Sequence, residues 1–150
     1  MGNTDVTVPA PFPPERFVRV LTDFSDNREK YWGNSENGYL KVHEVGDTWA
    51  DVTEGSRSGG GIWQRYRYDW SKPNEVHLEV LESNSFGKGS FWHYTLTPDG
   101  DGGSLINLRI HRVPTSAKAR LIDTLLMLVG NRIFGNDLRK SVRKIEETAG

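Results

Sequence analysis

The sequence predicts a single α+β domain in which a curved, seven-stranded antiparallel sheet wraps around a long C-terminal helix. Two observations carry this prediction. Between Gly38 and Val113, apolar and polar residues alternate and turn residues recur at short intervals, which is typical of antiparallel strands. From Ala117 to Glu147 the apolar residues recur instead at three- and four-residue spacings, which is typical of a helix. The length of 150 residues fits one domain with a sizeable core.

The composition and the net charge argue against several classes of protein function. The formal net charge of −1 lacks the basic excess that is typical of proteins that bind nucleic acids or anionic membranes. The absence of cysteine excludes disulfides and zinc sites built on sulfur. No run of 18 apolar residues predicts a membrane span, and the first ten residues do not resemble a signal peptide. We therefore expect a cytoplasmic protein with no nucleic-acid partner.

One strand and two short helices precede the main sheet. Val6 and Val8 alternate with polar residues, and Pro14 suits a first helical position because its missing N–H would have no acceptor there. Phe17 and Leu21 follow at helical spacing. The predicted elements are a strand from Asp5 to Val8, a helix from Pro14 to Thr22, and a helix that begins at Ser25 or Asp26 and ends at Trp32.

Six further strands complete the predicted sheet. The turns between them are too short to hold crossover helices, so neighbouring strands are expected to pair antiparallel. The glycine-rich stretch from Ser56 to Gly61 is expected to be a flexible connector. The predicted strands are Tyr39 to Val45, Thr48 to Glu54, Gly61 to Trp70, Glu75 to Glu82, Ser90 to Thr97 and Ser104 to Val113.

The alternation within these strands predicts which side chains point inward. Val76, Leu78 and Val80 alternate with polar residues, which marks the valine face as buried. The second and third strands are ambiguous, so the orientations of Tyr39, His43 and Trp49 stay open. The expected inner face is partly aromatic and partly polar, and it includes Gln64, Tyr66, Tyr68, Val80, Trp92, Tyr94, Leu108 and Ile110.

The long helix from Ala117 to Glu147 would run about 45 Å at 1.5 Å per residue, long enough to cover a whole sheet. Arg132 lies near its apolar stripe, where it would either extend to solvent or bind an acidic ligand group. Gly130 and Gly135 predict a bend or a thin spot that faces a cavity. The residues expected to face the sheet are Leu121, Leu125, Leu128, Val129, Ile133, Leu138, Val142 and Ile145.

The order of one strand, two short helices, six antiparallel strands and a long helix resembles the helix-grip arrangement of the SRPBCC superfamily. This superfamily includes START domains, birch-pollen-allergen-like proteins and polyketide cyclase/dehydrase proteins. The stretch from Gly46 to Gly55, together with Tyr68-Asp69-Trp70, is most similar to the polyketide-cyclase-like members. Other carriers of the resemblance are Val6 to Ala10 leading into Pro14 to Val18, the hairpin from Trp92 through Ser104, and the closing helix with Gly130 and Gly135.

The resemblance implies a cavity between the sheet and the long helix that takes a small hydrophobic or aromatic molecule, of polyketide or lipid type. It does not imply catalysis, because a fold alone does not establish a reaction. The leading hypothesis is therefore ligand binding, the second is a polyketide cyclase or dehydratase, and the third is an interaction module without a cavity. The expected ligand-binding residues are Gln64, Tyr66, Tyr68, Val80, Trp92, Tyr94, Leu108, Ile110, Leu125, Val129 and Arg132.

For the enzyme hypothesis, the candidate catalytic residues are Tyr66, Tyr94 and His43. A tyrosine could donate a hydrogen bond to a carbonyl or enolate oxygen, although its ordinary pKa of about 10 makes it a poor base. Asp99 and Asp101 resemble the start of a calcium loop, but the glutamate that such a loop needs is replaced by Ile110. We expect no metal and no cofactor, and the sequence leaves both a monomer and a homodimer open.

Overall fold

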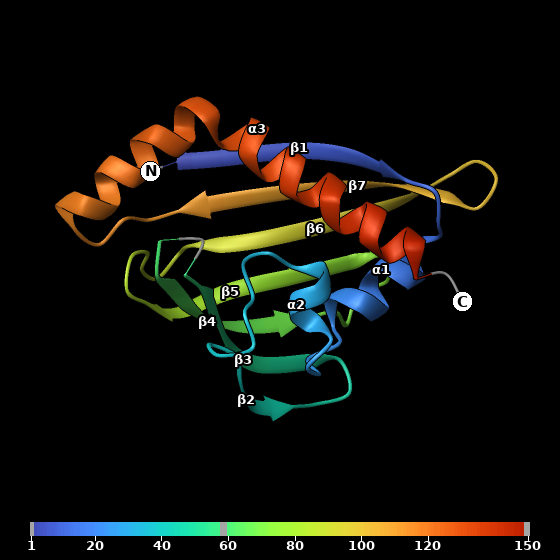
Figure 1. Cartoon of the computed structure of the whole chain (residues 1–150), viewed down its shortest axis with the longest axis horizontal. Helices are drawn as coiled ribbons and strands as arrows, with labels where there is room; N and C mark the ends of the chain where they lie inside the picture. Colours follow the sequence, from blue (N-terminus) through green and yellow to red (C-terminus); the bar gives the residue numbers. More distant parts are fainter. Residues whose placement is uncertain (1, 58–59, 149–150) are drawn as a thin grey trace.

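A computed structural model describes residues 2–57 and 60–148 of the chain (Figure 1). It confirms the predicted α+β class, with a seven-stranded antiparallel sheet, two short helices after the first strand and a long last helix. The elements in chain order are β1 (Gly2–Ala10), α1 (Pro14–Leu21), α2 (Arg28–Tyr31), β2 (Lys41–Val45), β3 (Trp49–Ser56), β4 (Ile62–Asp69), β5 (Glu75–Ser83), β6 (Phe91–Asp99), β7 (Gly103–Arg112) and α3 (Ala117–Glu147).

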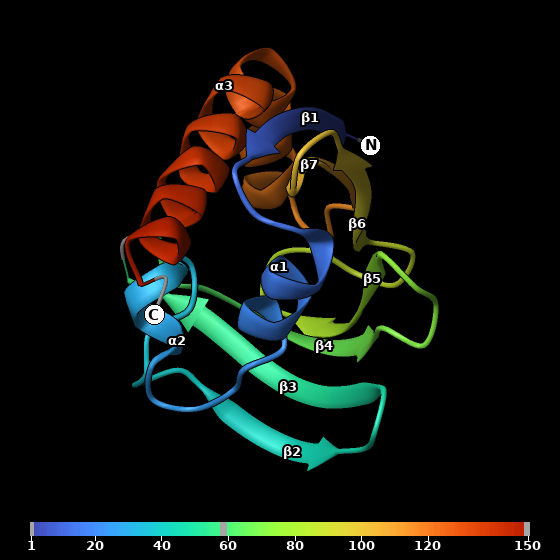
Figure 2. The ribbon, with the colours of Figure 1, turned by 90° about the vertical axis from the view of Figure 1, so that its right-hand side faces the viewer.

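The sheet has the strand order β1-β7-β6-β5-β4-β3-β2, and every neighbouring pair is antiparallel. Register shifts between β4 and β5 at Arg65 and Tyr66, and between β2 and β3 at Val42 and Glu44, mark irregularities that bend the strands. The sheet curves around α1, while α2 and α3 lie on the same side (Figure 2). This curvature makes room between the middle strands and α3.

The predicted strand phases are confirmed. Val76, Leu78 and Val80 of β5 are buried, as are the corresponding residues of β7. In β3, which the sequence left open, Ala50, Val52 and Glu54 point inward, while Trp49 lies beneath the guanidinium of Arg67. All of β2 is exposed. A carboxylate therefore lies in the inner row of β3, next to the aliphatic side chains of Ala50 and Val52.

The core is solid at the end of the sheet near α1. Phe17 is fully buried and packs edge-on against Trp32, with ring centroids 5.7 Å apart, and against Tyr94 at 5.6 Å. Leu138, Val142 and Ile145 in the second half of α3 are also buried there. The prediction that these three residues of α3 face the sheet is therefore confirmed.

Gly130 and Gly135 bring α3 close to β1. A Cβ atom at Gly130 would lie 3.0 Å from Thr4 Oγ1, and one at Gly135 would lie 3.8 Å from Val6 Cγ1. The helix does change direction along its length (Figure 1). The glycines nevertheless face β1 rather than a cavity, so the predicted thin spot in the cavity wall is wrong. Their missing side chains allow a close approach of helix and strand.

Strands β3 and β4 pair antiparallel, and before β4 Gly60 and Gly61 have φ angles of +82° and +75°, which favour glycine. Residues 58 and 59 of this predicted flexible stretch lie outside the described residues. Within the described ranges, no helix combines the length and the hydrophobicity that crossing a membrane requires.

Candidate ligand-binding pocket

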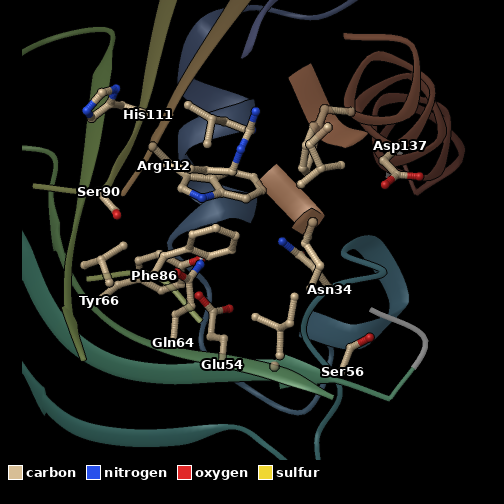
Figure 3. Close-up of a pocket in the computed structure, with 18 of the residues that line it drawn as sticks. Asn34, Glu54, Ser56, Gln64, Tyr66, Phe86, Ser90, His111, Arg112 and Asp137 are labelled. Atoms are coloured by element: carbon tan, nitrogen blue, oxygen red, sulfur yellow. The ribbon is translucent and has the colours of Figure 1, made fainter. Parts of the chain in front are cut away.

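A pocket of about 320 Å³ lies between the inner face of the sheet and the first half of α3 (Figure 3). The helix packs closely on β1 and on α2 but has few contacts with β4, β5 and β6, which leaves the space open. A volume in this range suits a small organic molecule. The lining residues are Asn34, Glu54, Gly55, Ser56, Ile62, Gln64, Tyr66, Val80, Phe86, Ser90, Trp92, Ile110, His111, Arg112, Ile122, Leu126, Ile133, Phe134 and Asp137.

Aromatic and aliphatic side chains form most of the wall. Trp92 of β6 meets Phe134 of α3 edge to face, with ring centroids 5.5 Å apart and an interplanar angle of 89°. Ile122 and Leu126 of α3 and Phe86 from the β5–β6 connection complete the apolar side. The pocket thus offers flat and branched apolar surfaces, which favour an aromatic or branched apolar ligand.

Trp92 and Phe134 also line a second, smaller space of about 70 Å³. Tyr94 and Leu108 belong to this smaller space, and neither lines the main pocket. Burial raises the pKa of Tyr94 above its ordinary value. The two predicted site tyrosines therefore stand in different compartments, with Tyr66 in the large one.

A buried ion pair forms the polar end of the main pocket. Glu54 is 6% exposed and accepts hydrogen bonds from Arg28 Nε, from the Tyr68 hydroxyl and, at 2.8 Å, from Ser35 Oγ. Arg28 Nη1 also donates to the carbonyl oxygens of Leu21 and Asp23, at 2.6 and 3.0 Å. This network satisfies the carboxylate and fixes its position, as a buried charge requires.

Burial and charge set the protonation of this network. Burial by itself lowers the pKa of the Arg28 guanidinium, but the neighbouring Glu54 carboxylate raises it above its ordinary value. Burial raises the pKa of the Tyr68 phenol well above its ordinary value. Arg28 therefore stays charged and Tyr68 stays neutral across the physiological pH range.

Gln64 and Tyr66 lie beside Glu54 on the floor of the pocket. Glu54 and Gln64 are direct cross-strand neighbours, and both are drawn on the sheet side, opposite Asp137 of α3 (Figure 3). Gln64 Nε2 donates to the Tyr66 hydroxyl at 2.5 Å. Burial raises the pKa of Tyr66 well above its ordinary value, so the phenol keeps its proton at neutral pH. Because Tyr66 accepts a hydrogen bond from Gln64, its own O–H can donate to a ligand oxygen.

A second buried ion pair holds the first half of α3. Arg112 at the end of β7 donates through Nε to Asp123 Oδ1 at 2.9 Å and through Nη1 to Thr4 Oγ1 at 2.8 Å. Both partners of the ion pair are 4% exposed. The pair links α3 to the two strands at the edge of the sheet, and Arg112 also lines the pocket.

The structure brings five of the predicted binding residues together around the main pocket: Gln64, Tyr66, Val80, Trp92 and Ile110. Tyr94 and Leu108 line the smaller space, and Tyr68 lies in the Arg28–Glu54 network without lining either. His43 is exposed and forms a 2.8 Å hydrogen bond with Thr53 Oγ1 outside both spaces, which removes it as a catalytic candidate there.

The predicted inward orientation of Leu125 and Val129 is wrong, and Arg132 takes the first of its two predicted orientations, toward solvent, so it does not line the pocket. Leu125 is 55% exposed, Val129 is 44% exposed, and Arg132 is also exposed. At 100° per residue, Leu125 and Leu138 lie about 140° apart around a regular helix, so one side cannot hold both. Ala119, Asp123 and Gly130 take the buried positions in the first half instead.

Sequence reasoning also missed several pocket residues. Glu54 was in an ambiguous strand, and its partner Arg28 is 26 positions away in a short helix. Ile122, Leu126 and Phe134 share one side of α3 at four- and eight-residue spacings, a signal that the more numerous leucines on the other side concealed. No three His, Cys, Asp or Glu side chains are placed to hold a metal ion in the part of the chain that the structure describes.

No protein-family model matches the sequence, and curated protein sequences give no match either. Solved structures do match along the full chain. The protein TTHA0849 from Thermus thermophilus has a TM-score of 0.79 at 16% identity and covers 99% of both chains. The ZhuI aromatase/cyclase from Streptomyces sp. R1128 has a TM-score of 0.78 at 15% identity and covers 99% of this chain and 95% of its own.

The chain has the helix-grip fold, which it shares with these structures. A START superfamily protein from Mycobacterium smegmatis is similar to the same extent, with a TM-score of 0.77 at 10% identity and coverage of 98% of this chain and 99% of its own. At these identities the likeness establishes the fold, and the pocket's chemistry has to be argued from the residues of this chain.

Proposed function

We propose that the protein binds a small apolar or aromatic molecule in the main pocket, with one ligand oxygen hydrogen-bonded at the polar end. The observation that carries the proposal is the pairing of an apolar wall, formed by Trp92, Phe134 and Leu126, with a fixed polar group at one end. Pockets for small molecules combine such walls with a few convergent polar groups.

The polar end favours a ligand that carries a hydroxyl or carbonyl oxygen. Tyr66 keeps its proton and has an O–H free to donate, while Glu54 already accepts hydrogen bonds from Arg28, Ser35 and Tyr68. A ligand carboxylate next to Glu54 would be repelled. We therefore infer a neutral aromatic or polycyclic ligand with an oxygen substituent. An interaction module without a cavity would need a filled interior, and a space of about 320 Å³ argues against it.

Two adjacent positions of α3 provide a matched test. Leu126 lines the pocket, whereas Leu125 is exposed and lines neither described space. With naphthol as the probe, isothermal titration calorimetry should show that Leu126→Trp weakens binding by about tenfold or more, because the indole fills the space. Leu125→Trp adds the same group on the outside and should bind as the wild type does. Equal binding by both variants, or no naphthol binding by the wild type, would contradict the proposal.

A second candidate function is a cyclase or dehydratase acting on such a ligand. The protonated Tyr66 phenol in the pocket favours it, since this phenol could stabilise an enolate oxygen by hydrogen bonding. Incubation with a linear poly-β-ketone should then give cyclised product that Tyr66→Phe reduces by about 100-fold, the typical effect of removing one such donor. Tyr94→Phe, which alters only the smaller space, serves as the control. Product at the uncatalysed level with the wild type would exclude this reaction for that substrate class.

A further inference from the structure

The first half of α3 exposes an apolar surface on the side away from the sheet. Leu121, Leu125 and Leu128 are 63%, 55% and 78% exposed. At 100° per residue they fall within an arc of about 60°, so they form one continuous strip. Single exposed apolar residues are ordinary, but a contiguous group on one element marks an interaction surface. We call these three residues the outer leucine strip.

Cationic side chains surround the outer leucine strip. Helix α3 (Ala117–Glu147) contains seven Lys and Arg residues against two Asp and two Glu residues, a formal charge of +3, which leaves −4 for the remainder of a chain whose net charge is −1. Asp123 is buried against Arg112, Asp137 is exposed on the pocket side of the helix, and Glu146 and Glu147 are exposed in its last turn. Lys118, Arg132 and Arg139 are exposed on the same side of the helix as the leucines. The side of α3 that carries the outer leucine strip is therefore basic, although the chain as a whole is not.

We propose that this face of α3 docks on the surface of an anionic phospholipid membrane. The outer leucine strip would enter the boundary between headgroups and acyl chains, and Lys118, Arg132 and Arg139 would contact the phosphates. Helices at membrane surfaces combine an apolar strip with flanking Lys and Arg in this way, and each cation near an anionic surface strengthens binding. The charge expectation drawn from the whole sequence is thereby revised for this one face.

The charge pattern selects this partner over a second copy of the chain. A symmetric contact through the outer leucine strip would bring the surrounding cations of two copies together, and such like-charge contacts are unfavourable. An anionic bilayer satisfies the leucines and the cations at once. Ile133 is 42% exposed and also lines the pocket, so apolar surface continues from the outer face to the pocket wall. Membrane docking of α3 does not depend on the proposed function. Loading of the pocket from the membrane would depend on it.

Vesicle flotation tests the docking without any ligand. The wild type should float with vesicles of equal parts phosphatidylglycerol and phosphatidylcholine, less so as salt is added, and should not float with pure phosphatidylcholine. Leu125→Ser/Leu128→Ser should reduce the partition coefficient by about tenfold or more. Arg132→Gln/Arg139→Gln should reduce it by about fivefold for each cation.

Val45→Ser and Lys41→Gln on β2 are the matched controls, since they remove an exposed apolar side chain and a cation far from α3 (Figure 1). Both should float as the wild type does. Absence of wild-type flotation, equal flotation of all variants, or a wild-type dimer that Leu125→Ser/Leu128→Ser dissociates without any flotation would overturn the proposal. Naphthol binding measured in the same variants should be unchanged, so failure of the docking would leave the proposed function standing.

Discussion

The two halves of α3 differ in what they bury, although they belong to one uninterrupted helix. In the second half, Leu138, Val142 and Ile145 lie in the core, and the helix is held by apolar burial. In the first half the buried side carries Ala119, Asp123 and Gly130, and Leu121, Leu125 and Leu128 face outward. The first half is therefore anchored to the sheet by the Arg112–Asp123 ion pair and by the close approach of its backbone to β1 at Gly130. Its large apolar residues are therefore free to line a pocket and to form an outer surface.

The Arg112–Asp123 ion pair should make the largest single contribution to the stability of the first half of α3 on the sheet. Asp123→Ala leaves the guanidinium of Arg112 buried without its carboxylate, and breaking a buried pair in this way costs about 3–5 kcal/mol of unfolding free energy. Urea unfolding followed by circular dichroism measures the loss. Asp51→Ala breaks the more exposed Arg65–Asp51 pair and should cost about 1 kcal/mol or less. Equal losses would remove the anchoring role assigned to Asp123.

Truncation of apolar side chains should have the next-largest effect, and this effect should differ between the two halves of α3. Ile145→Ala should lower the unfolding free energy by about 2–4 kcal/mol, because Ile145 has 0% exposure and its truncation leaves a cavity. Leu128→Ala, at 78% exposure, should change it by about 0.5 kcal/mol or less. The same urea titration measures both. A large loss of unfolding free energy in Leu128→Ala would show that the outer leucine strip is covered and that the two halves do not differ in this way.

The two glycines should respond with opposite signs. At Gly135 an added Cβ would meet Val6 Cγ1 at an ordinary 3.8 Å and the flexible end of Arg139 at 3.4 Å, so Gly135→Ala should gain up to about 1 kcal/mol from helix propensity. At Gly130 the added Cβ would lie 3.0 Å from Thr4 Oγ1, which Arg112 holds by a hydrogen bond. Gly130→Ala should therefore be destabilising. Stabilisation by both substitutions would mean that α3 is not tightly seated on β1.

The smallest effect concerns pH and a region outside α3. Burial and the neighbouring His93, whose Nδ1 lies 2.9 Å from Nδ1 of His77, lower the pKa of His77 below its ordinary value. The folded state then binds fewer protons than the unfolded state, so this stability is present above about pH 6.5 and is lost as the pH falls through the folded pKa. Thermal unfolding between pH 7 and pH 5 should show a slope that His77→Asn reduces. An unchanged slope would assign the acid sensitivity to other groups.

The sequence predicted the sheet better than it predicted the helix, and the reason is physical. In a strand, side chains alternate with a period of two, so three residues such as Val76, Leu78 and Val80 fix the inward face. In α3, three- and four-residue spacings persist from Leu121 to Ile145, but the apolar positions drift from one side of the helix to the other. Spacing alone does not reveal this drift, whereas summing 100° per residue over the whole length does.

Local sequence patterns could not predict the polar end of the pocket. Glu54 stands in a strand whose two faces both mix polar and apolar residues, and only its contact with Arg28 explains how a carboxylate can be buried there. That contact joins α2 to β3, and no periodicity encodes it. The aromatic pocket residues Tyr66 and Trp92 were predicted because they follow the same alternation as the aliphatic core around them.

Native mass spectrometry of protein purified from its own host would detect a ligand retained in the main pocket. The account predicts that the wild type and Leu125→Trp retain a small apolar molecule with an oxygen substituent, and that Leu126→Trp, one position along the helix, does not. Retention of the same molecule by Leu126→Trp, or its absence from the wild type and from Leu125→Trp, would contradict the claim that the space between the sheet and the first half of α3 is a binding pocket.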